Sequence, residues 1–444
     1  MKQLVFIGVF MVAYLNCHSQ EGAGKRWSLQ QCIQYAVKHN HEVRQLQYTL
    51  NDYKAERTRA IGSFLPAISG SVNGQYNFGR AVDPETNTYT NVSTFHNGYS
   101  LSASIPLFDG LMRFHELKMA KANLLKGKHG VSAQRDEVAL QVMRSYMDVQ
   151  YYQGMVEMAE RKREESEALL RQTLVMLEVG TKGESDVAQM RATVASDDYE
   201  VTRQQNLLSK AVLTLKGQMN YPIADSLALE ETRNLPSELV LETAGEIYER
   251  AQSYHPQILQ AKQAFEAVKY SLRSAKGGLS PTISIGAGVS TSYYKNLDSR
   301  DALRFREQWK NNAGQYLYAT LSIPLFNRLS TLTNIRKQRN NLRRAQENLD
   351  YQQTELQRLI TEAVSEQQNS WKETEKMQLK MESDSIASQL TIRKWEEGLA
   401  SPIDVQTATV ILLQSRAQLL QCQLTYYYHT QLLNYYKGVP LWIE

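Results

Sequence analysis

The sequence lacks the long apolar segment that a membrane-spanning helix requires. No stretch of its 444 residues approaches the run of roughly 20 apolar residues that crosses a bilayer as a helix. Cysteine is scarce, and three residues are too few for a disulfide-stabilised scaffold. Neither sign of charge is in excess, because 50 Lys+Arg face 46 Asp+Glu, and this balance predicts no nucleic-acid partner. A net charge of only +4 together with 25 tyrosines excludes a disordered chain.

The N-terminus has the pattern of a secretory signal peptide over residues 1–19. A positive residue precedes an apolar segment at residues 4–15, which is too short for a stop-transfer helix. Small residues before the expected cleavage point predict cleavage after Ser19. Acylation of Cys17 is the competing interpretation, although the Asn before it fits a lipoprotein poorly. Either way, the pattern predicts export.

The remaining sequence is a duplicated unit, because motifs of its first half recur in its second half in the same order. The offset is 215 residues for the first proline pair (281 − 66) and 218 for the second (324 − 106). The tips repeat at 218 as well (404 − 186), so only three residues are inserted between the sets. The paired positions are Pro66 and Pro281, Pro106 and Pro324, Gly180 and Gly398, and Asp186 and Asp404.

The duplication predicts two repeats, at residues 20–221 and 242–444, joined by a linker at 222–241. Each repeat has the order helix, strand, loop, strand, very long helix, tip, helix. The first repeat is expected to hold a helix at about 27–62, strands at about 65–79 and 99–108, a long helix at about 109–179 and a returning helix at 184–219. The second is expected to hold a helix at about 242–277, strands at about 281–294 and 316–326, a long helix at about 327–397 and a returning helix at 402–436.

The long helices are too long for the core of a compact domain, since about 71 residues rise roughly 107 Å. Apolar or small residues recur every seven positions along the second one, which predicts a coiled-coil seam weakened by polar entries. These positions are Leu342, Leu349, Leu356, Ala363, Ser370 and Met377. Each long helix with its returning helix therefore predicts an antiparallel coiled-coil hairpin. The fold class is mainly α with a small β part.

The four short strands alternate between apolar residues on one face and small polar residues on the other. Residues 68–78 show the pattern, with Ile68, Val72 and Tyr76 opposed by Ser69, Ser71 and Asn73. Aromatic residues gather at the strand ends, and polar loops are expected at about 79–98 and 294–315. Lipid outside, water inside and aromatic girdles are typical of a transmembrane β-barrel. A soluble sheet packed on a helix is the alternative for any single strand.

Four strands cannot close a barrel wide enough for a channel, and open edges are not tolerated in lipid. The edges must then pair with other copies, and three copies give about twelve strands. This geometry predicts a homotrimer. Four prolines are expected at the junctions between strand and helix, where the missing N–H is tolerated: Pro66, Pro106, Pro281 and Pro324.

The sequence resembles the TolC-type outer-membrane efflux proteins over its whole mature length. The resemblance rests on Ser104-Ile105-Pro106-Leu107-Phe108-Asp109-Gly110, on Asn77-Phe78-Gly79-Arg80 with Asp83-Pro84, and on the two tips. It implies a twelve-stranded barrel in the outer membrane of a Gram-negative bacterium, which continues into a large periplasmic extension, a helical tunnel. The implied partners are a periplasmic adaptor, an inner-membrane pump and the lipid of the outer membrane, and no catalysis is implied.

The two tips carry the candidate functional residues. Gly398 is suited to end the long helix, and Ser401-Pro402-Ile403-Asp404 has the pattern of a capping box. Asp186 and Asp404 therefore have a local role at helix starts. The resemblance adds a second role, in which Asp404 forms an acidic constriction and Ser185 and Asp186 belong to a latch between helix pairs.

The resemblance also implies a latch aromatic at Trp395, where other family members use a hydrogen-bonding ring. The basic latch residue of the family aligns with Ala400, which is a departure, and Lys182 or Arg393 are the candidates to replace it. An adaptor is expected to contact small exposed residues of the tips, which let another helical hairpin approach. These are Gly180, Thr181, Gly398, Leu399 and Ser401.

No motif of the sequence predicts a cofactor, a metal site or an enzyme. His39 and His41 diverge on a helix and lack a third ligand. Cys32 and Cys422 remain after cleavage, as two separate side chains or as a pair. The predicted function is a passive outer-membrane tunnel of a tripartite export system, with cargo left open. The alternative is a secreted or periplasmic coiled-coil scaffold without a pore.

Overall fold

The computed structural model describes residues 26–83, 87–91, 93–230, 242–298 and 304–442. The predicted signal peptide, with Cys17 and Ser19, and half of the predicted linker lie outside the described residues. The chain divides into two compact units. A helical unit comprises the described residues of Met1–Arg44, Ala133–Ala251 and Leu356–Glu444, and a sheet unit comprises those of Gln45–Ser132 and Gln252–Glu355.

The two units do not follow the two repeats, because each unit takes segments from both copies. One strand pair cannot form a stable sheet alone, so the two copies pool their strands in a single sheet. One helical hairpin likewise cannot bury its apolar seam alone. The repeat is therefore the unit of sequence, whereas packing unites the equivalent parts of both copies.

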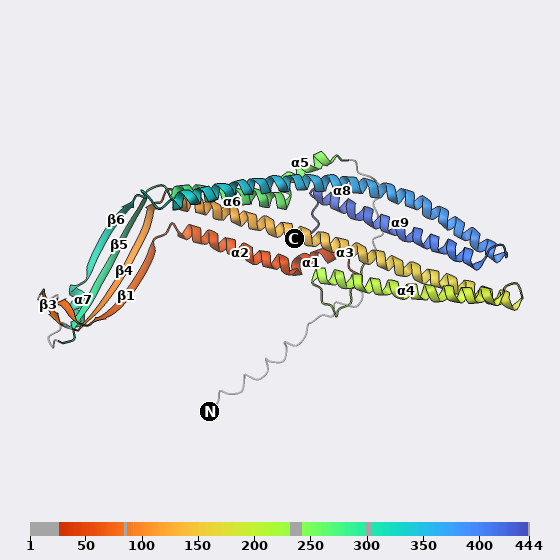
Figure 1. Ribbon diagram of the computed structural model, residues 1–444, viewed down its shortest axis with the longest axis horizontal. Coiled ribbons are helices and arrows are strands. Elements are labelled where there is room, and N and C mark those ends of the chain that lie inside the picture. The colour runs from red at the N-terminus through yellow and green to blue at the C-terminus, as the bar shows by residue number, and fades with distance from the viewer. Residues whose placement is uncertain (1–25, 84–86, 92, 231–241, 299–303, 443–444) are drawn as a thin grey trace, which may run out of the picture. The chain divides into compact units, whose positions relative to one another are not determined.

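Helices make up most of the described chain (Figure 1). Their bounds are α1 Leu29–His39, α2 His41–Gly62, α3 Met112–Glu178, α4 Glu184–Met219, α5 Ala244–Tyr254, α6 Pro256–Gly277, α7 Phe305–Asn311, α8 Ser330–Glu396 and α9 Pro402–Tyr436. The long helices α3 and α8 hold 67 residues each. At 1.5 Å per residue each rises about 100 Å.

The first helix of each repeat is broken in the structure, where the sequence pattern predicts one continuous helix. Asn40 is extended between α1 and α2, and its side-chain oxygen accepts from the N–H of Glu42 at 2.8 Å and of Val43 at 3.2 Å. His255 is extended between α5 and α6, before Pro256. An Asn cap starts a new helix, and a residue before proline avoids the helical region.

The core of the helical unit lies along α3, where Val142 and Val149 are fully buried. α1 packs on α4 through Cys32, Ile33 and Ala36, which are buried too. On α8 the expected heptad positions Leu356, Ala363 and Ser370 are 2–3% exposed. Apolar stripes of this kind hold a helical hairpin together, because each Å² of apolar surface that is buried contributes about 25 cal/mol to the free energy of folding.

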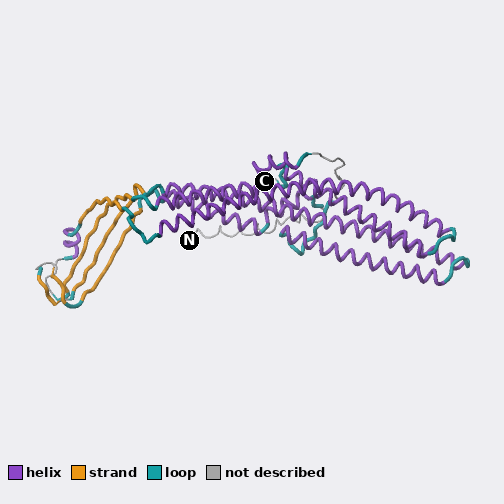
Figure 2. The backbone as a smooth tube through the Cα atoms, turned by 45° about the horizontal axis from the view of Figure 1, so that its top comes forward, coloured by secondary structure: helices purple, strands orange, loops and turns teal. Residues whose placement is uncertain are grey.

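The sheet unit contains a four-stranded antiparallel sheet in the order β1-β4-β5-β6, shown in orange in Figure 2. The strand bounds are β1 Ala67–Asn77, β4 Thr94–Phe108, β5 Thr282–Asn296 and β6 Gly314–Ser322. A small hairpin, β2 Arg80–Asp83 with β3 Thr88–Asn91, lies in the loop expected at 79–98. The loop expected at 294–315 contains α7, which the sequence pattern does not predict.

The register of the strands places their apolar residues on one face of the sheet and their small polar residues on the other. Val72 lies opposite Tyr99, and Leu101 lies opposite Val289, on one apolar face. On the other face Ser71 Oγ and Ser100 Oγ are 2.8 Å apart, and Ser69 Oγ lies 3.1 Å from that of Ser102. A slip of one residue would turn every side chain to the wrong face, so the pattern strongly specifies this register.

Tyr316 and Tyr318 lie on the small polar face, over two glycines of β5. A Cβ at Gly286 would collide with the Tyr318 ring, and one at Gly288 would collide with the Tyr316 ring. These glycines are therefore required for the packing of the two rings. This explains why β5 is glycine-rich on one face only.

Within the described residues, no helix is sufficiently long and apolar to cross a membrane. In the same part of the chain, no three His, Cys, Asp or Glu side chains are grouped as metal ligands would be. Cys32 and Cys422 are both free, and burial raises the pKa of the Cys32 thiol to about 12.

Candidate functional site at the sheet edges, junctions and helix tips

The outer strands of the four-stranded sheet have free edges. β1 pairs only with β4, and β6 pairs only with β5, among the residues that the structure describes. Every residue of β1 and of β6 is exposed in the single chain. Unpaired N–H and C=O groups along a strand are a template for another strand. The sheet is therefore complete only when each edge finds a partner.

The junction of the first repeat is built around Arg113, near the start of α3. Its guanidinium lies 2.8 Å from Asp109 Oδ2, and both side chains are mostly buried, at 14% and 13% exposed. It also donates to the carbonyl oxygens of Ser63, at 3.0 Å, and Pro106, at 2.5 Å. One side chain thus ties the end of α2 and the end of β4 to the start of α3. Sequence reasoning missed Arg113, although Asp109 lies at the i, i+4 spacing of an ion pair, because the Ser63 carbonyl is 50 residues away.

The four prolines differ in position. Pro66 directly precedes β1, Pro281 directly precedes β5, and Pro324 follows the end of β6, so all three lie between strand and helix. Pro106 does not, because β4 continues to Phe108 and the register shifts between these two residues. The expectation for Pro106 is corrected accordingly. Pro106 still pairs with Ser284, and the residue left out of the ladder is the neighbouring Leu107. Proline inside a strand is tolerated next to such a bulge.

Each junction turns through two consecutive residues with positive φ. In the first repeat these are Gly110 at +66° and Leu111 at +65°. In the second they are Arg328 at +55° and Leu329 at +63°. Glycine is indispensable only in the first, where a Cβ on Gly110 would collide with the Gly277 carbonyl oxygen. The second repeat holds the same turn with an arginine, at the cost of backbone strain.

Both long helices end in the same Schellman motif. At the first tip Gly180 has φ +76°, and the N–H of Thr181 donates to the Met176 carbonyl at 2.9 Å. At the second tip Gly398 has φ +80°, and the N–H of Leu399 donates to the Lys394 carbonyl at 2.7 Å. This motif satisfies carbonyls that a helix end leaves unpaired.

The returning helices begin differently. Asp404 Oδ2 accepts from the N–H of Ser401 at 2.9 Å and from its hydroxyl at 2.7 Å, while Ser401 Oγ accepts from the N–H of Asp404 at 3.3 Å. At the first tip Asp186 Oδ2 accepts only from the N–H of Gly183, at 3.0 Å. A glycine cap has no side chain to return the bond, so half of the capping box is missing.

These hydrogen bonds explain the electrostatics of the second tip. The backbone N–H of Ser401, and then its hydroxyl, lower the pKa of Asp404 below its ordinary value. Asp404 is therefore an exposed, fully ionised carboxylate at neutral pH. Its capping role is visible in a single chain, and a carboxylate at a helix start is favourable in any case.

The two tips meet at Trp395, which is 1% exposed. Lys182 Nζ, from the first tip, lies 5.7 Å from the centroid of the Trp395 ring, within the range of a cation–π contact. Lys182 and Arg393 are the two candidates for the basic latch residue, and it is Lys182 that lies beside the Trp395 ring. Arg393 is exposed. The contact joins one hairpin to the other through a single charge.

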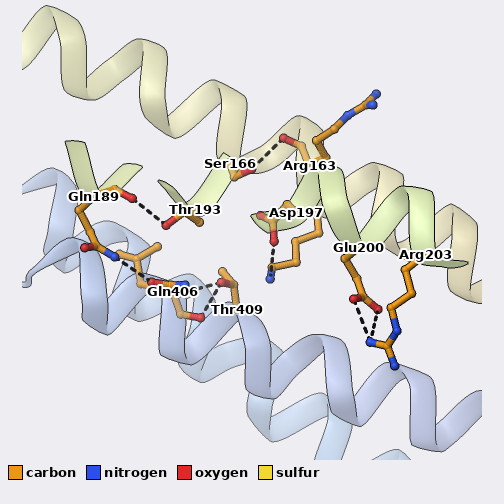
Figure 3. A network of polar contacts seen from close by, with 11 residues as sticks. Arg163, Ser166, Gln189, Thr193, Asp197, Glu200, Arg203, Gln406 and Thr409 are labelled. Atoms are coloured by element: carbon orange, nitrogen blue, oxygen red, sulfur yellow. Dashed lines mark hydrogen bonds and ion pairs between the residues drawn. The ribbon is translucent and has the colours of Figure 1, made fainter. Parts of the chain in front are cut away.

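A polar seam continues along the hairpins beyond the tips (Figure 3). Gln189 Nε2 of α4 donates to Gln406 Oε1 of α9 at 3.3 Å. Within the first hairpin Lys162 Nζ lies 2.8 Å from Asp197 Oδ1, and the Asp197 side chain is 5% exposed. Sequence reasoning missed these partners, which are 217 and 35 residues apart (406 − 189 and 197 − 162).

Farther along, α4 and α9 are separated by a cleft of about 490 Å³ with α3 contributing to its lining. Its walls are mixed, with charged Arg144 and Lys210 beside Tyr428. Polar contacts here accompany apolar packing between the hairpins, since Leu420 of α9 lies directly against Gly154 of α3.

The expected adaptor-contact residues are all exposed in the single chain. Leu399 is 74% exposed at the turn of the second tip, and a Cβ added at Gly180 or at Gly398 would meet no heavy atom within 4 Å. Thr181 and Ser401 are exposed as well, although both side chains make local hydrogen bonds. Ser185 is exposed, next to half-buried Asp186.

The sequence is similar to curated efflux proteins. It is 24% identical to the outer membrane efflux protein BepC of Brucella suis over 308 residues, which are 69% of this chain and 62% of BepC. It is 21% identical to the cation efflux system protein CusC of Escherichia coli over 416 residues, or 87% of this chain and 81% of CusC. The chain thus spans less than two thirds of BepC.

The fold is shared with solved channel proteins. A crystal structure of CusC has a TM-score of 0.77 at 17% identity, covering 93% of this chain and 92% of that one. The outer membrane protein VceC of Vibrio cholerae has a TM-score of 0.78 at 14% identity, covering 93% and 96%. At these identities the likeness establishes the architecture.

The family assignment follows both repeats. The description outer membrane efflux protein matches residues 32–220 and again residues 247–434, two ranges that begin 215 residues apart (247 − 32). They include the sheet strands, the junctions and both tips. The chain belongs to the outer membrane efflux protein family.

Proposed function

We propose that this protein is the outer-membrane channel of a tripartite export system and acts as a homotrimer. The observation that carries the proposal is the four-stranded sheet with two free edges and one apolar face. Three copies would close a wall of about twelve strands, with the serine-rich face toward water. The family favours this function over a scaffold without a pore.

Disulfide cross-linking between copies tests the closure. Cysteines would replace Val72 of β1 and Leu317 of β6, which are 70% and 81% exposed on the apolar face, in a background with Cys32→Ala and Cys422→Ser. Mild oxidation in outer membranes should give covalent dimers and trimers. Nearby pairs, such as Ile68 with Leu321, would allow for the register between copies. The matched control pairs Val72 with Val289 of the inner strand β5, and it should stay monomeric.

Covalent dimers and trimers from the control pair would contradict the closed wall. Their absence from every edge pair would contradict it as well. Planar bilayer recordings complete the test, because a trimeric barrel with a polar lumen should conduct ions. A chain that fractionates with soluble proteins would support the scaffold instead.

We further propose that the tips form the periplasmic gate. Three copies of Asp404 would surround the mouth and attract cations. The proposal is supported by the exposure of Asp404 and by its lowered pKa, which keeps it ionised. Ser185, Asp186 and Trp395 are proposed as the latch, with Lys182 supplying the cation that Ala400 lacks.

Charge and capping at Asp404 can be separated. Asp404→Asn keeps a side-chain acceptor for Ser401 and removes the charge, whereas Asp404→Ala removes both. If the charge gates the channel, both variants should lose block by divalent cations and cation selectivity in bilayers. Unchanged block in Asp404→Asn would leave Asp404 as a helix cap only.

The tips are also proposed as the docking surface for the adaptor, through Gly180, Thr181, Gly398, Leu399 and Ser401. Leu399→Asp should abolish export in cells and capture of the adaptor by the purified channel. Leu379→Asp on α8 is a matched control, because Leu379 is an exposed leucine as well, at 55% against 74% for Leu399, but lies outside the tips. Equal loss in both variants would argue against a docking role for the tips.

A further inference from the structure

Helix α7 is held on the apolar face of the sheet by its backbone partners on β5. The buried Gln308 side chain donates to the Tyr294 carbonyl and accepts from the Tyr294 N–H, both at 2.8 Å. Thr291 Oγ donates to the Trp309 carbonyl, and Asn312 Nδ2 donates to the Ser292 carbonyl, both at 2.8 Å. Figure 2 shows this helix beside the loop ends of the strands. Its place is therefore fixed by the strand.

The helix extends the apolar face with two further rings. Trp309 packs on Tyr99 of β4 with ring centroids 4.4 Å apart, and Phe305 packs on Tyr293 of β5 at 5.2 Å. Both rings remain partly open, since Phe305 is 46% and Trp309 is 40% exposed. Aromatic side chains of this kind are enriched where acyl chains meet headgroups.

Cations flank these rings. Arg306 and Lys310 are four residues apart, so they share one side of the helix, and Arg304 precedes it. All three are exposed, and Glu307 is the one carboxylate of α7. In the described part of the chain, neither Arg306 nor Lys310 forms an ion pair.

We propose that α7 is an interfacial anchor that binds the phosphate groups of anionic lipids at the outer surface of the membrane. The inference rests on the proposed function, in which the apolar face of the sheet meets lipid. Because the rings of α7 continue that face, they would lie at its upper boundary, where headgroup phosphates begin. A short helix with aromatic rings on one side and cations beside them is the pattern of interfacial helices.

The charge of the site favours a lipid surface over a second copy of the chain. Exposed cations that pair with no carboxylate among the described residues gain from an anionic layer, by about fivefold in affinity for each Lys or Arg near the surface. Because the factors multiply, two such cations predict roughly a twenty-five-fold preference for anionic over zwitterionic lipid. The preference should fall as salt screens the surface.

Fluorescence quenching at Trp309 tests the proposal in the intact protein. Trimers are reconstituted with dibrominated phosphatidylglycerol or dibrominated phosphatidylcholine, and bromine quenches only rings that touch the lipid. The variant Trp309→Phe supplies the background of the other four of the five tryptophans. Trp309 should be quenched by both lipids, with a relative binding constant for phosphatidylglycerol that is about twenty-five-fold higher at low salt.

The charge variant is Arg306→Gln with Lys310→Gln, which should reduce that ratio to near one. The control is Lys372→Gln with Lys376→Gln, two exposed cations also four residues apart, on α8. It should keep the full preference. Both variants change exposed side chains only, so folding should be preserved and can be verified by trimer content.

Three results would overturn the anchor. One is a Trp309 that neither lipid quenches, which would place α7 against protein or water. The second is equal quenching by both lipids in the native sequence, and the third is an unchanged preference in the charge variant. Failure of the proposed function would appear earlier and separately, as vesicles that contain no trimer.

Discussion

The two copies of the repeat are strengthened at opposite ends. The first copy has the elaborate junction, where Arg113 ties a helix and a strand together and Gly110 fits against Gly277. Its tip, however, has only half a capping box. The second copy has Arg328 in a strained turn at its junction and a complete capping box around Ser401. Duplication therefore conserved the backbone path, while the side chains that stabilise it diverged.

The helix breaks differ between the copies in the same manner. Asn40 and His255 occupy equivalent positions (255 − 40 = 215). Asn40 caps the following helix with its own side chain, whereas His255 makes no side-chain cap bond and relies on Pro256. His255 is 4% exposed, and burial lowers its pKa to about 4. One copy is thus insensitive to pH at this position, and the other is not.

The largest effect is expected from a methyl group at the first junction. Gly110→Ala would force a Cβ against the Gly277 carbonyl at positive φ, and we expect a loss of about 4 kcal/mol. Gly398→Ala has the same φ constraint but open space, so it should cost only about 1 kcal/mol. Thermal melting of the purified protein in detergent would compare them, and equal losses would contradict the packing argument.

Acidification should destabilise the second helix break. The pKa of His255 is about 4 when folded and 6.5 ordinarily, so the unfolded chain binds the proton first as pH falls. The stability contribution is complete above pH 6.5 and declines as the pH falls to about 4, by about 3 kcal/mol in total. His255→Asn should flatten this part of the curve, measured as melting temperature against pH. If the melting temperature of His255→Asn still falls between pH 6.5 and 4, other titratable groups cause the pH dependence.

The tips should respond to smaller changes in opposite directions. Ser401→Ala removes a cap and should cost about 1 kcal/mol, whereas Gly183→Ser would complete the box of the first tip and stabilise it by a few tenths of a kcal/mol. Local amide hydrogen exchange at the starts of α9 and α4 would report both. Faster amide exchange at the start of α4 in Gly183→Ser would show that Gly183 is needed for another conformation of the first tip.

A small effect is also expected at the second junction. Arg328→Gly relieves positive φ at an exposed residue, but glycine also loses more freedom on folding, so a net gain of about 0.5 kcal/mol is expected. Arg336→Gly, in the interior of α8, is the contrasting case and should lose about 1 kcal/mol. A loss at position 328 would mean that the arginine side chain makes a stabilising contact in the assembled protein.

Local patterns account for what the sequence could predict. Gly398, Ser401 and Asp404 were predicted at a helix end and a helix start because their partners lie within a few residues. The alternation of serine with leucine predicted the two faces of the sheet, since the strand period is two. The break at Pro256 also carried a local signal, which the helical periodicity of its neighbours concealed.

Contacts distant in sequence could not be predicted in this way. Arg113 reaches a carbonyl 50 residues away, and Gln189 meets Gln406 only after the whole second sheet segment has intervened. α7 was hidden because a polar loop and a short amphipathic helix have similar composition. Gln308 acquires its role only when β5 is beside it.

The free edges of β1 and β6 have a genetic consequence if three copies share one wall. When intact and tip-defective chains are made in equal amounts and assemble at random, only about one trimer in eight contains three intact chains. A defect at the tips should therefore be dominant, because the sheet of the defective chain still enters the shared wall. A defect that removes an edge strand should be recessive, because that chain never joins the trimer.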